Sequence, residues 1–175
     1  MSDLILILGG ARSGKGIFAE RMTEGFKKVA YLATAEALDE EMRERIENHK
    51  KQRPGSWVTL EVPHNLVEAF RRIDSDTEAV VVDCLTLYIS NQMTRFSEEE
   101  IVEKVSELLD LLGAFRGRVI FISNEVGMGI VPEYKMGRDY RDILGKVNQV
   151  IAEAAGEVYL MVAGIPLKVK MADGR

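Results

Sequence analysis

The stretch LILILGGARSGKG at residues 4–16 joins a short apolar run to a glycine-rich turn, and a helical pattern follows over residues 17–26. A strand, a turn of the form GxxxxGK and a helix in this order are typical of a phosphate-binding loop, whose backbone N–H groups and helix N-terminus point at phosphate oxygens. Gly9 and Gly14 allow the turn, and Lys15 is placed to neutralise the β and γ phosphates. We therefore expect a nucleoside triphosphate to bind here.

One position of the loop departs from the usual pattern. Gly16 stands where a Ser or Thr hydroxyl normally binds Mg²⁺, so Ser13 or a water would fill that coordination position, or phosphoryl transfer would be slow. Asp83 ends the apolar run AVVVD and is predicted to hold Mg²⁺ or its water shell beside the loop; the alternative is an aspartate that caps the next helix. The predicted phosphate-binding residues are Gly9, Gly10, Ala11, Arg12, Ser13, Gly14, Lys15 and Gly16.

Short apolar runs alternate with helical patterns along the chain. Strands are predicted at residues 4–8, 29–32, 79–82, 119–123 and 158–162. Strands that are apolar on both faces and separated by helices indicate a largely parallel sheet covered by helices on both sides, so the predicted fold class is α/β. No linker interrupts the pattern, and we expect a single P-loop nucleotide-binding catalytic domain over residues 1–175.

The clearest helical pattern lies at residues 98–115, where Ser97 and Glu100 form a capping-box pattern at the start. Its apolar face is interpreted as core packing. Further elements are predicted as helices at residues 39–52 and 138–155, an edge strand or hairpin arm at residues 165–171, and a frayed end at residues 172–175.

The composition of the 175 residues is that of an ordinary globular protein, with 46% hydrophobic and 29% charged residues. A net charge of −5 predicts no broad basic surface for nucleic acid. Cys84 is the single cysteine, so an intrachain disulfide is excluded, and we expect a buried side chain. The first apolar run is too short for a membrane helix, and we expect no stable membrane insertion and a cytoplasmic location.

The phosphate loop alone leaves kinase, NTPase and GTPase interpretations open, although the chain has no NKxD motif of an ordinary GTPase. Other segments narrow the choice. They are RIENHKKQRP at residues 45–54, Trp57, TLEVP at 59–63, VDCLT at 82–86 and NEVGMGIVPE at 124–133. In this order and spacing they resemble the adenosylcobinamide kinase/guanylyltransferase family of cobalamin biosynthesis, over essentially the whole chain.

The resemblance implies a RecA-like P-loop fold, a homotrimer and two reactions. The family phosphorylates adenosylcobinamide with ATP or GTP, and then transfers GMP from GTP to adenosylcobinamide phosphate through a guanylyl-histidine. His49 matches the family's histidine in the pattern RIxxHxxxRP. The further positions that match nucleotide contacts of the family are Ala33, Thr34, Ala35, Lys50, Lys51, Gln52, Arg53, Glu61 and Asp83.

The residue chemistry of the His49 segment agrees with this assignment. A neutral imidazole can attack the α-phosphate of GTP, and the basic side chains of Lys50, Lys51 and Arg53 can stabilise the charge that develops on the phosphates. The other histidine, His64, is interpreted as structural at a helix entry. Two alternatives stay open at this point: a P-loop kinase of another small metabolite, and a nucleotide-binding regulatory protein.

The segment at residues 124–133 follows a predicted strand at the edge where ligand-binding loops of parallel sheets gather. Its glycines and apolar side chains would suit a loop that closes over the corrinoid. They would equally suit a contact between subunits.

Overall fold

The computed structural model describes residues 3–37, 39–52 and 54–171, except for the side chains of Arg45, His49 and Gln52. Seven strands form one sheet in the order β3-β2-β4-β5-β1-β6-β7. Neighbouring strands are parallel except for β6 and β7, which are antiparallel. The strands are β1 (Asp3–Gly9), β2 (Val29–Ala33), β3 (Val58–Glu61), β4 (Ala79–Asp83), β5 (Arg118–Ile122), β6 (Glu157–Val162) and β7 (Ile165–Lys170).

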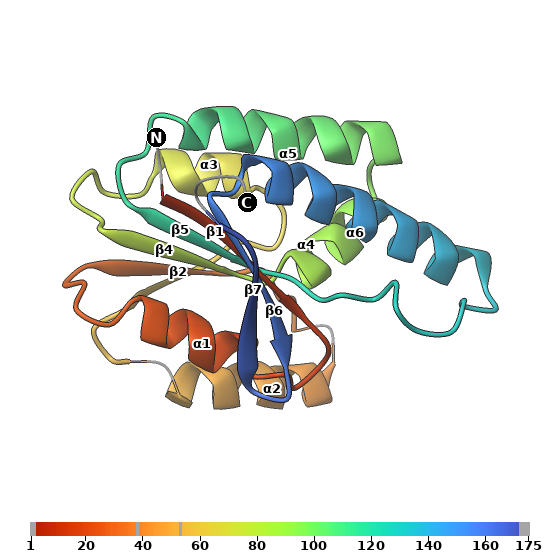
Figure 1. Cartoon of the computed structure of the whole chain (residues 1–175), viewed down its shortest axis with the longest axis horizontal. Coiled ribbons are helices and arrows are strands. Elements are labelled where there is room, and N and C mark those ends of the chain that lie inside the picture. Colours follow the sequence, from red (N-terminus) through yellow and green to blue (C-terminus); the bar gives the residue numbers. More distant parts are fainter. Residues whose placement is uncertain (1–2, 38, 53, 172–175) are drawn as a thin grey trace.

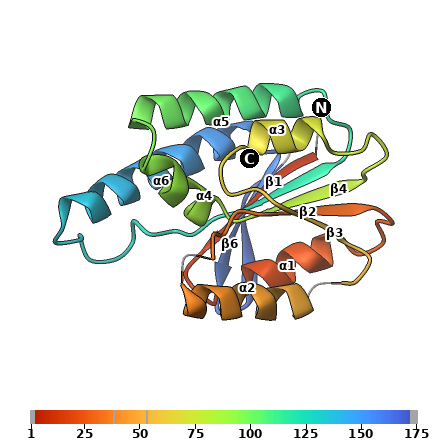
Figure 2. The same ribbon diagram turned by 180° about the vertical axis from the view of Figure 1, so that it is seen from behind.

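Helices cover both faces of the sheet. The helices are α1 (Lys15–Met22), α2 (Glu40–Gln52), α3 (Leu66–Arg71), α4 (Leu85–Met93), α5 (Glu98–Leu112) and α6 (Lys135–Ala154). In Figure 1, α1 and α2 lie below the sheet, whereas α3, α4, α5 and α6 lie above it. Figure 2 shows the same two layers from behind. The predicted α/β class is confirmed.

The central strands are apolar on both faces because each face is buried against helices. Leu6 and Phe121 belong to the larger core, under α3 to α6, whereas the neighbouring residues Ile7 and Ile120 belong to the core on the α1 side. This alternation explains why the sequence shows continuous apolar runs instead of the polar-apolar pattern of a half-exposed sheet. No helix in the described ranges is long and apolar enough to span a membrane.

Helices α1, α5 and α6 have boundaries that differ from the sequence prediction. Helix α1 spans Lys15–Met22 and not residues 17–26. The capping box predicted at the start of α5 is present, since the Ser97 side chain accepts from the Glu100 N–H and the Glu100 side chain accepts from the Ser97 N–H. The helix ends at Leu112, however, and not at residue 115, because Gly113 lacks a side chain that would favour the helix and a turn begins there. Helix α6 begins at Lys135, one turn before the predicted start.

The hairpin of β6 and β7 touches the phosphate loop. Its turn residues, Ala163 and Gly164, have φ angles of 50° and 84°. The Gly164 N–H donates to the Ser13 carbonyl oxygen at 3.0 Å. The predicted edge strand at the end of the chain is therefore confirmed as one arm of a hairpin, and the tip of that hairpin supports the loop that follows β1.

Candidate active site

Several of the predicted site residues lie at the carboxyl ends of the strands. The loop after β1, the residues after β2 and the end of β4 all lie at this edge, and β5 separates β1 from β4. In the register of the sheet, Ala33 is opposite Glu61 of β3 on one side and opposite Asp83 of β4 on the other. Three predicted nucleotide contacts that are far apart in the sequence thus form one row across three strands.

The phosphate loop needs glycine at two positions. A Cβ atom on Gly9 would lie 2.6 Å from the Ser13 Oγ and 2.8 Å from the Met161 carbonyl oxygen, so the loop closes too tightly for a side chain there. Gly14 has a φ of 92°, which L-residues with a side chain adopt only with strain. Arg12, with a φ of 55°, is in the left-handed region as well. These turns bring the loop to the N-terminus of α1, where backbone N–H groups favour an anion.

Lys15 folds back on this loop. Its Nζ donates to the carbonyl oxygens of Gly9 and Gly10, at 2.9 and 2.7 Å, and the residue is only 9% exposed. Burial lowers the pKa of Lys15 from its ordinary value, although the nearby Cys84 and Asp83 act in the opposite direction. The hydrogen-bond partners of the Lys15 ammonium group are thus neutral carbonyl groups. Negatively charged phosphate oxygens are better partners for it.

The residues around Asp83 suit a magnesium ion that is carried in by a nucleotide. The Tyr31 hydroxyl donates to the Asp83 carboxylate, which orients it. The Ser13 Oγ is buried and has no hydrogen-bond partner within the described part of the chain. The described residues contain no cluster of three or more His, Cys, Asp and Glu side chains that could hold a metal by themselves. Nucleotide-bound Mg²⁺ needs fewer protein ligands, because phosphate oxygens and water complete its coordination shell.

Gly16 lies at the exposed beginning of α1, and a Cβ atom added there would have no neighbour within 4 Å. The absence of a hydroxyl at this position is thus not a consequence of crowding. A serine side chain would fit.

Thr34 links the row of strand ends to the next helix. It is fully buried, and its Oγ1 donates to the Cys84 carbonyl oxygen at 2.7 Å and accepts from the Cys84 N–H at 2.8 Å. The Thr34 N–H donates to the Asp83 carbonyl oxygen at 3.1 Å. Cys84 is partly buried, and burial raises the pKa of its thiol to about 11. A thiol of this kind is inert at neutral pH and is consistent with a structural role.

Asn91 on α4 is a residue of this edge that the sequence did not reveal. Its Nδ2 donates to the carbonyl oxygens of Thr34 and Pro63, at 3.0 and 3.1 Å. Next to it, the Gln92 Nε2 donates to the His64 carbonyl oxygen at 3.1 Å. An asparagine in an apolar helix gives no local signal of such contacts, because they depend on segments that are distant in the sequence.

The basic segment around His49 lies on α2, on the same face of the sheet as α1 (Figure 2). The His49 and Gln52 side chains and the whole of Arg53 lie outside the described residues. The Lys50 Nζ is 2.9 Å from the Glu61 Oε1, and hydrogen bonding to Glu61 raises the pKa of Lys50. The structure therefore brings together Lys50 and Glu61, two of the predicted nucleotide contacts, at the end of β3. Lys51 is exposed.

His64 is engaged in a different way. Its Nε2 lies 2.9 Å from the Glu36 Oε1, and both side chains are partly buried. The residue precedes Asn65, whose side chain caps α3 by accepting from the Glu68 N–H. These contacts agree with the interpretation of His64 as a structural residue at a helix entry.

The segment at residues 124–133 is anchored at its base and exposed at its tip. The Glu125 N–H donates to the Gly9 carbonyl oxygen at 3.2 Å, so the base lies against the phosphate loop. The Asn124 N–H donates to the Thr86 Oγ1 at 2.9 Å. Met128 and Ile130, in contrast, are 77% and 96% exposed.

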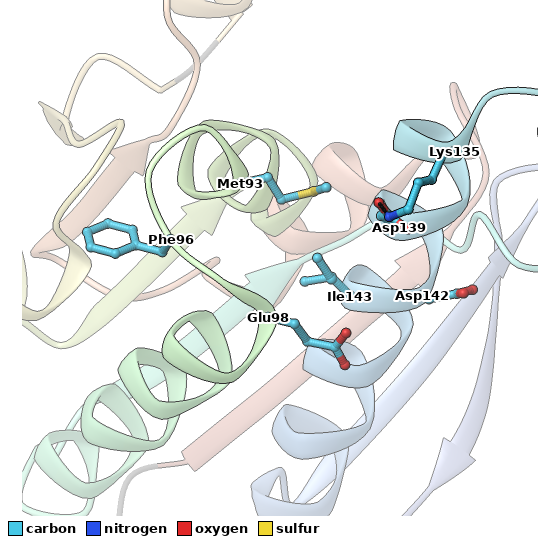
Figure 3. A pocket seen from close by; sticks show the side chains of 7 residues that line it. All are labelled: Met93, Phe96, Glu98, Lys135, Asp139, Asp142 and Ile143. Carbon is cyan, nitrogen blue, oxygen red and sulfur yellow. Dashed lines mark hydrogen bonds and ion pairs between the residues drawn. The ribbon is translucent and has the colours of Figure 1, made fainter.

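An open depression of about 360 Å³ lies between α4, α5 and α6, away from the predicted site residues. Figure 3 shows the side chains around it, among them Glu98, Lys135 and Asp139. The Lys135 Nζ is already paired with the Asp139 Oδ2 at 2.6 Å. We assign no part of the predicted chemistry to this depression.

A parallel sheet with a phosphate loop after β1, an aspartate at the end of β4 and a strand inserted between them defines a RecA-like P-loop nucleotide-binding protein. The fold is similar to that of the RadB recombinase, with a TM-score of 0.51 and 17% sequence identity over 90% of this chain and 73% of the recombinase chain. That likeness supports the fold alone.

The family is shown by sequence comparison. Residues 5–169 match the family described as cobinamide kinase / cobinamide phosphate guanyltransferase, and the chain belongs to this family. It is 38% identical to the bifunctional adenosylcobalamin biosynthesis protein CobU of Escherichia coli, over 95% of this chain and 99% of that protein. It is 42% identical to the bifunctional adenosylcobalamin biosynthesis protein CobP of Pseudomonas aeruginosa, over 94% and 96%. The predicted resemblance, with its kinase and guanylyltransferase activities, is confirmed.

Proposed function

We propose that the chain carries out both reactions at the carboxyl edge of its sheet, with His49 as the residue that carries GMP. The row formed by Glu61, Ala33 and Asp83 supports this proposal most directly, because the sheet aligns three residues that match nucleotide contacts of the family. The Lys50–Glu61 ion pair then ties the residue next to His49 to one end of the row.

In the kinase step, the substrate hydroxyl attacks the γ-phosphate of ATP or GTP, an O–P bond forms, and the nucleoside diphosphate leaves. The residues of the phosphate loop bind the triphosphate, with Lys15 moving from its two carbonyl partners to the β and γ phosphates. Mg²⁺, held by Asp83 and the Ser13 hydroxyl with water, would neutralise phosphate charge. Backbone groups of Gly10, Ala11 and Arg12 complete the cradle.

In the guanylyl step, an imidazole nitrogen of His49 attacks the α-phosphorus of GTP, a P–N bond forms and pyrophosphate leaves. A phosphate oxygen of adenosylcobinamide phosphate then attacks the same phosphorus, which forms a P–O–P linkage and releases the imidazole. Lys50, Lys51 and Arg53 stabilise the charge of the phosphates. The Glu61 carboxylate accepts hydrogen bonds from guanine N–H groups. Ala33, Ala35 and Gln52 line the nucleotide, and the fully buried Thr34 supports the site by binding the backbone of Asp83 and Cys84.

The proposal includes three broader points. The exposed apolar side chains of β7 and of the segment at residues 124–133 suit contacts between subunits, and we propose a homotrimer. Residues 1–175 act as a single catalytic domain. The cytoplasmic location stays a prediction.

The test uses GTP labelled at the α-phosphate. The wild-type chain is expected to form a covalent adduct that is labile in acid and stable in alkali, His49→Ala is expected to form none, and His64→Ala is expected to reach the same final extent as wild type. Adduct on a folded His49→Ala variant would assign the nucleophile elsewhere.

A further inference from the structure

A group of side chains ties together the segments that leave β2 and β3. We call this group, Thr34, Glu36, His64, Asn91 and Gln92, the strand-end clamp. Its centre is Asn91, whose amide group has two N–H donors and directs them to the Thr34 and Pro63 carbonyl oxygens, at 3.0 and 3.1 Å. One side chain of α4 therefore joins the chain just after both strands.

The remaining contacts of the strand-end clamp restrain the same two segments. Gln92, which is 1% exposed, donates from its Nε2 to the His64 carbonyl oxygen at 3.1 Å. The His64 Nε2 is 2.9 Å from the Glu36 Oε1. Thr34 is in turn bound to the backbone of Asp83 and Cys84. The segment that leaves β2 is thus held by β4, by α4 and by the entry to α3.

Helix α2, which begins at Glu40 and contains His49, follows this segment in the chain. The far end of α2 is held by the Lys50–Glu61 ion pair at 2.9 Å. That pair is exposed, and exposed ion pairs restrain weakly. The partly buried contacts of Asn91 are therefore the firmer of the two attachments, and they hold the segment that precedes α2 in the chain.

Because α2 is long, a small tilt at its first residues moves its far end by a larger distance. His49 is nine residues beyond Glu40, which corresponds to about 14 Å at the rise of an α-helix. A tilt of about 10° at the base would move His49 by ~2 Å, and a displacement of about 1 Å can slow a positioned reaction by ~100-fold. The phosphate loop, in contrast, follows β1 and makes no contact with Asn91 among the hydrogen bonds described.

We propose that Asn91 is a positioning residue for GMP transfer: it fixes the base of α2 and so the approach of His49 to the α-phosphate of GTP. This inference rests on the proposed function of His49. It predicts a larger effect of Asn91 on the guanylyl step, which depends on where α2 starts, than on the kinase step, which depends on the loop after β1 and on Asp83.

The experiment compares Asn91→Leu with Ile89→Ala. Leucine has a similar size but no N–H donor, and Ile89 is a fully buried residue of the same helix outside the strand-end clamp. For each variant, one measures the single-turnover rate of adduct formation with saturating GTP labelled at the α-phosphate, the rate of γ-phosphoryl transfer to adenosylcobinamide, and the melting temperature.

For Asn91→Leu we expect a rate of adduct formation at least about tenfold below wild type, the same final extent of adduct, and a kinase rate within about threefold. Ile89→Ala is expected to lower the melting temperature without slowing adduct formation more than the kinase reaction. Glu36→Ala, at a partly exposed position, is also expected to slow adduct formation more than the kinase reaction, but by a smaller factor. It provides the test if Asn91→Leu does not fold.

Two results would overturn the inference. One is adduct formation at the wild-type rate in Asn91→Leu, or in Glu36→Ala if only that variant folds; the other is a parallel fall of both activities that matches Ile89→Ala. Failure of the proposed function looks different, because the wild-type chain would then form no adduct or His49→Ala would form one.

Discussion

At the scale of single residues, the most consequential side chain is Lys15. In the structure its ammonium group donates to the Gly9 and Gly10 carbonyl oxygens, and burial lowers its pKa. A triphosphate offers the same group charged acceptors, and hydrogen bonds between charged partners are roughly twice as strong as neutral ones. Nucleotide binding should therefore depend strongly on this residue.

Lys15→Ala is expected to weaken triphosphate binding by about 1.5–3 kcal/mol, or roughly 10- to 150-fold, since it removes a hydrogen-bonded positive charge. Isothermal titration with a non-hydrolysable GTP analogue measures the loss. Lys27→Ala, at an exposed position, serves as the control and should bind like wild type. Unchanged affinity in a folded Lys15→Ala variant would rule out the assignment of the loop.

Gly16→Ser is expected to raise the kinase rate or to lower its Mg²⁺ requirement, because the variant restores a hydroxyl where P-loop proteins bind magnesium. The added side chain has no neighbour within 4 Å, so the fold should tolerate it. Kinase rates over a magnesium titration measure the effect, with Gly16→Ala as the matched control. If serine and alanine behave alike, another ligand such as Ser13 already supplies the contact.

At the scale of elements, local patterns predicted those parts of the structure that depend on neighbouring residues. The turn of Gly9 and Gly14, the position of Lys15 and the start of α5 at Ser97 all follow from short-range geometry, and the structure has them as predicted. Helix α5 joins α4 and α6 in covering the larger core, so its first turn should contribute measurably to stability.

Ser97→Ala is expected to lower the free energy of unfolding by about 1 kcal/mol, since it removes the acceptor of the Glu100 N–H in the first turn of α5. Urea denaturation followed by circular dichroism measures the change. Ser106→Ala, on the exposed face of the same helix, is the comparison and should alter stability less. Equal effects would mean that the cap contributes nothing of its own.

Other elements could not be predicted, and the reason differs for each. Strand β3 has only four residues and is mostly exposed, so it lacks an apolar run. Helix α4, LTLYISNQM, is apolar or uncharged throughout, and its inner face cannot be recognised without the rest of the fold. The role of Asn91 depends on partners 57 and 28 positions away along the chain. The row of Glu61, Ala33 and Asp83 likewise depends on sheet register, which local sequence patterns do not reveal.

At the scale of the whole molecule, the edge strand β7 and the segment at residues 124–133 are among the places where apolar side chains are exposed. Ile165, Leu167 and Val169 of the edge strand β7 are each more than half exposed, as are Met128 and Ile130. Exposed apolar groups of this kind mark surfaces that another molecule covers. The homotrimer proposed above would cover such side chains with other copies of the chain.

Sedimentation equilibrium is expected to give a mass three times that of the 19.6 kDa chain. Leu167→Glu should shift the population towards the monomer, because a charge buried without a partner in an interface is strongly unfavourable. Lys146→Glu, at an exposed position on α6, is the control. A monomeric wild-type chain at micromolar concentration would refute the trimer.

The contact between the Gly164 N–H and the Ser13 carbonyl oxygen has a consequence for protein synthesis. The phosphate loop is synthesised before the strands on either side of β1, which are residues 118–122 and 157–162. The nascent chain therefore contains the phosphate-loop sequence before the strands that hold this loop in its folded conformation have been made. Translation that stops before Glu157 leaves β1 without one of its neighbours and the phosphate loop without the hairpin, and we expect such a chain to bind GTP more weakly than the finished enzyme.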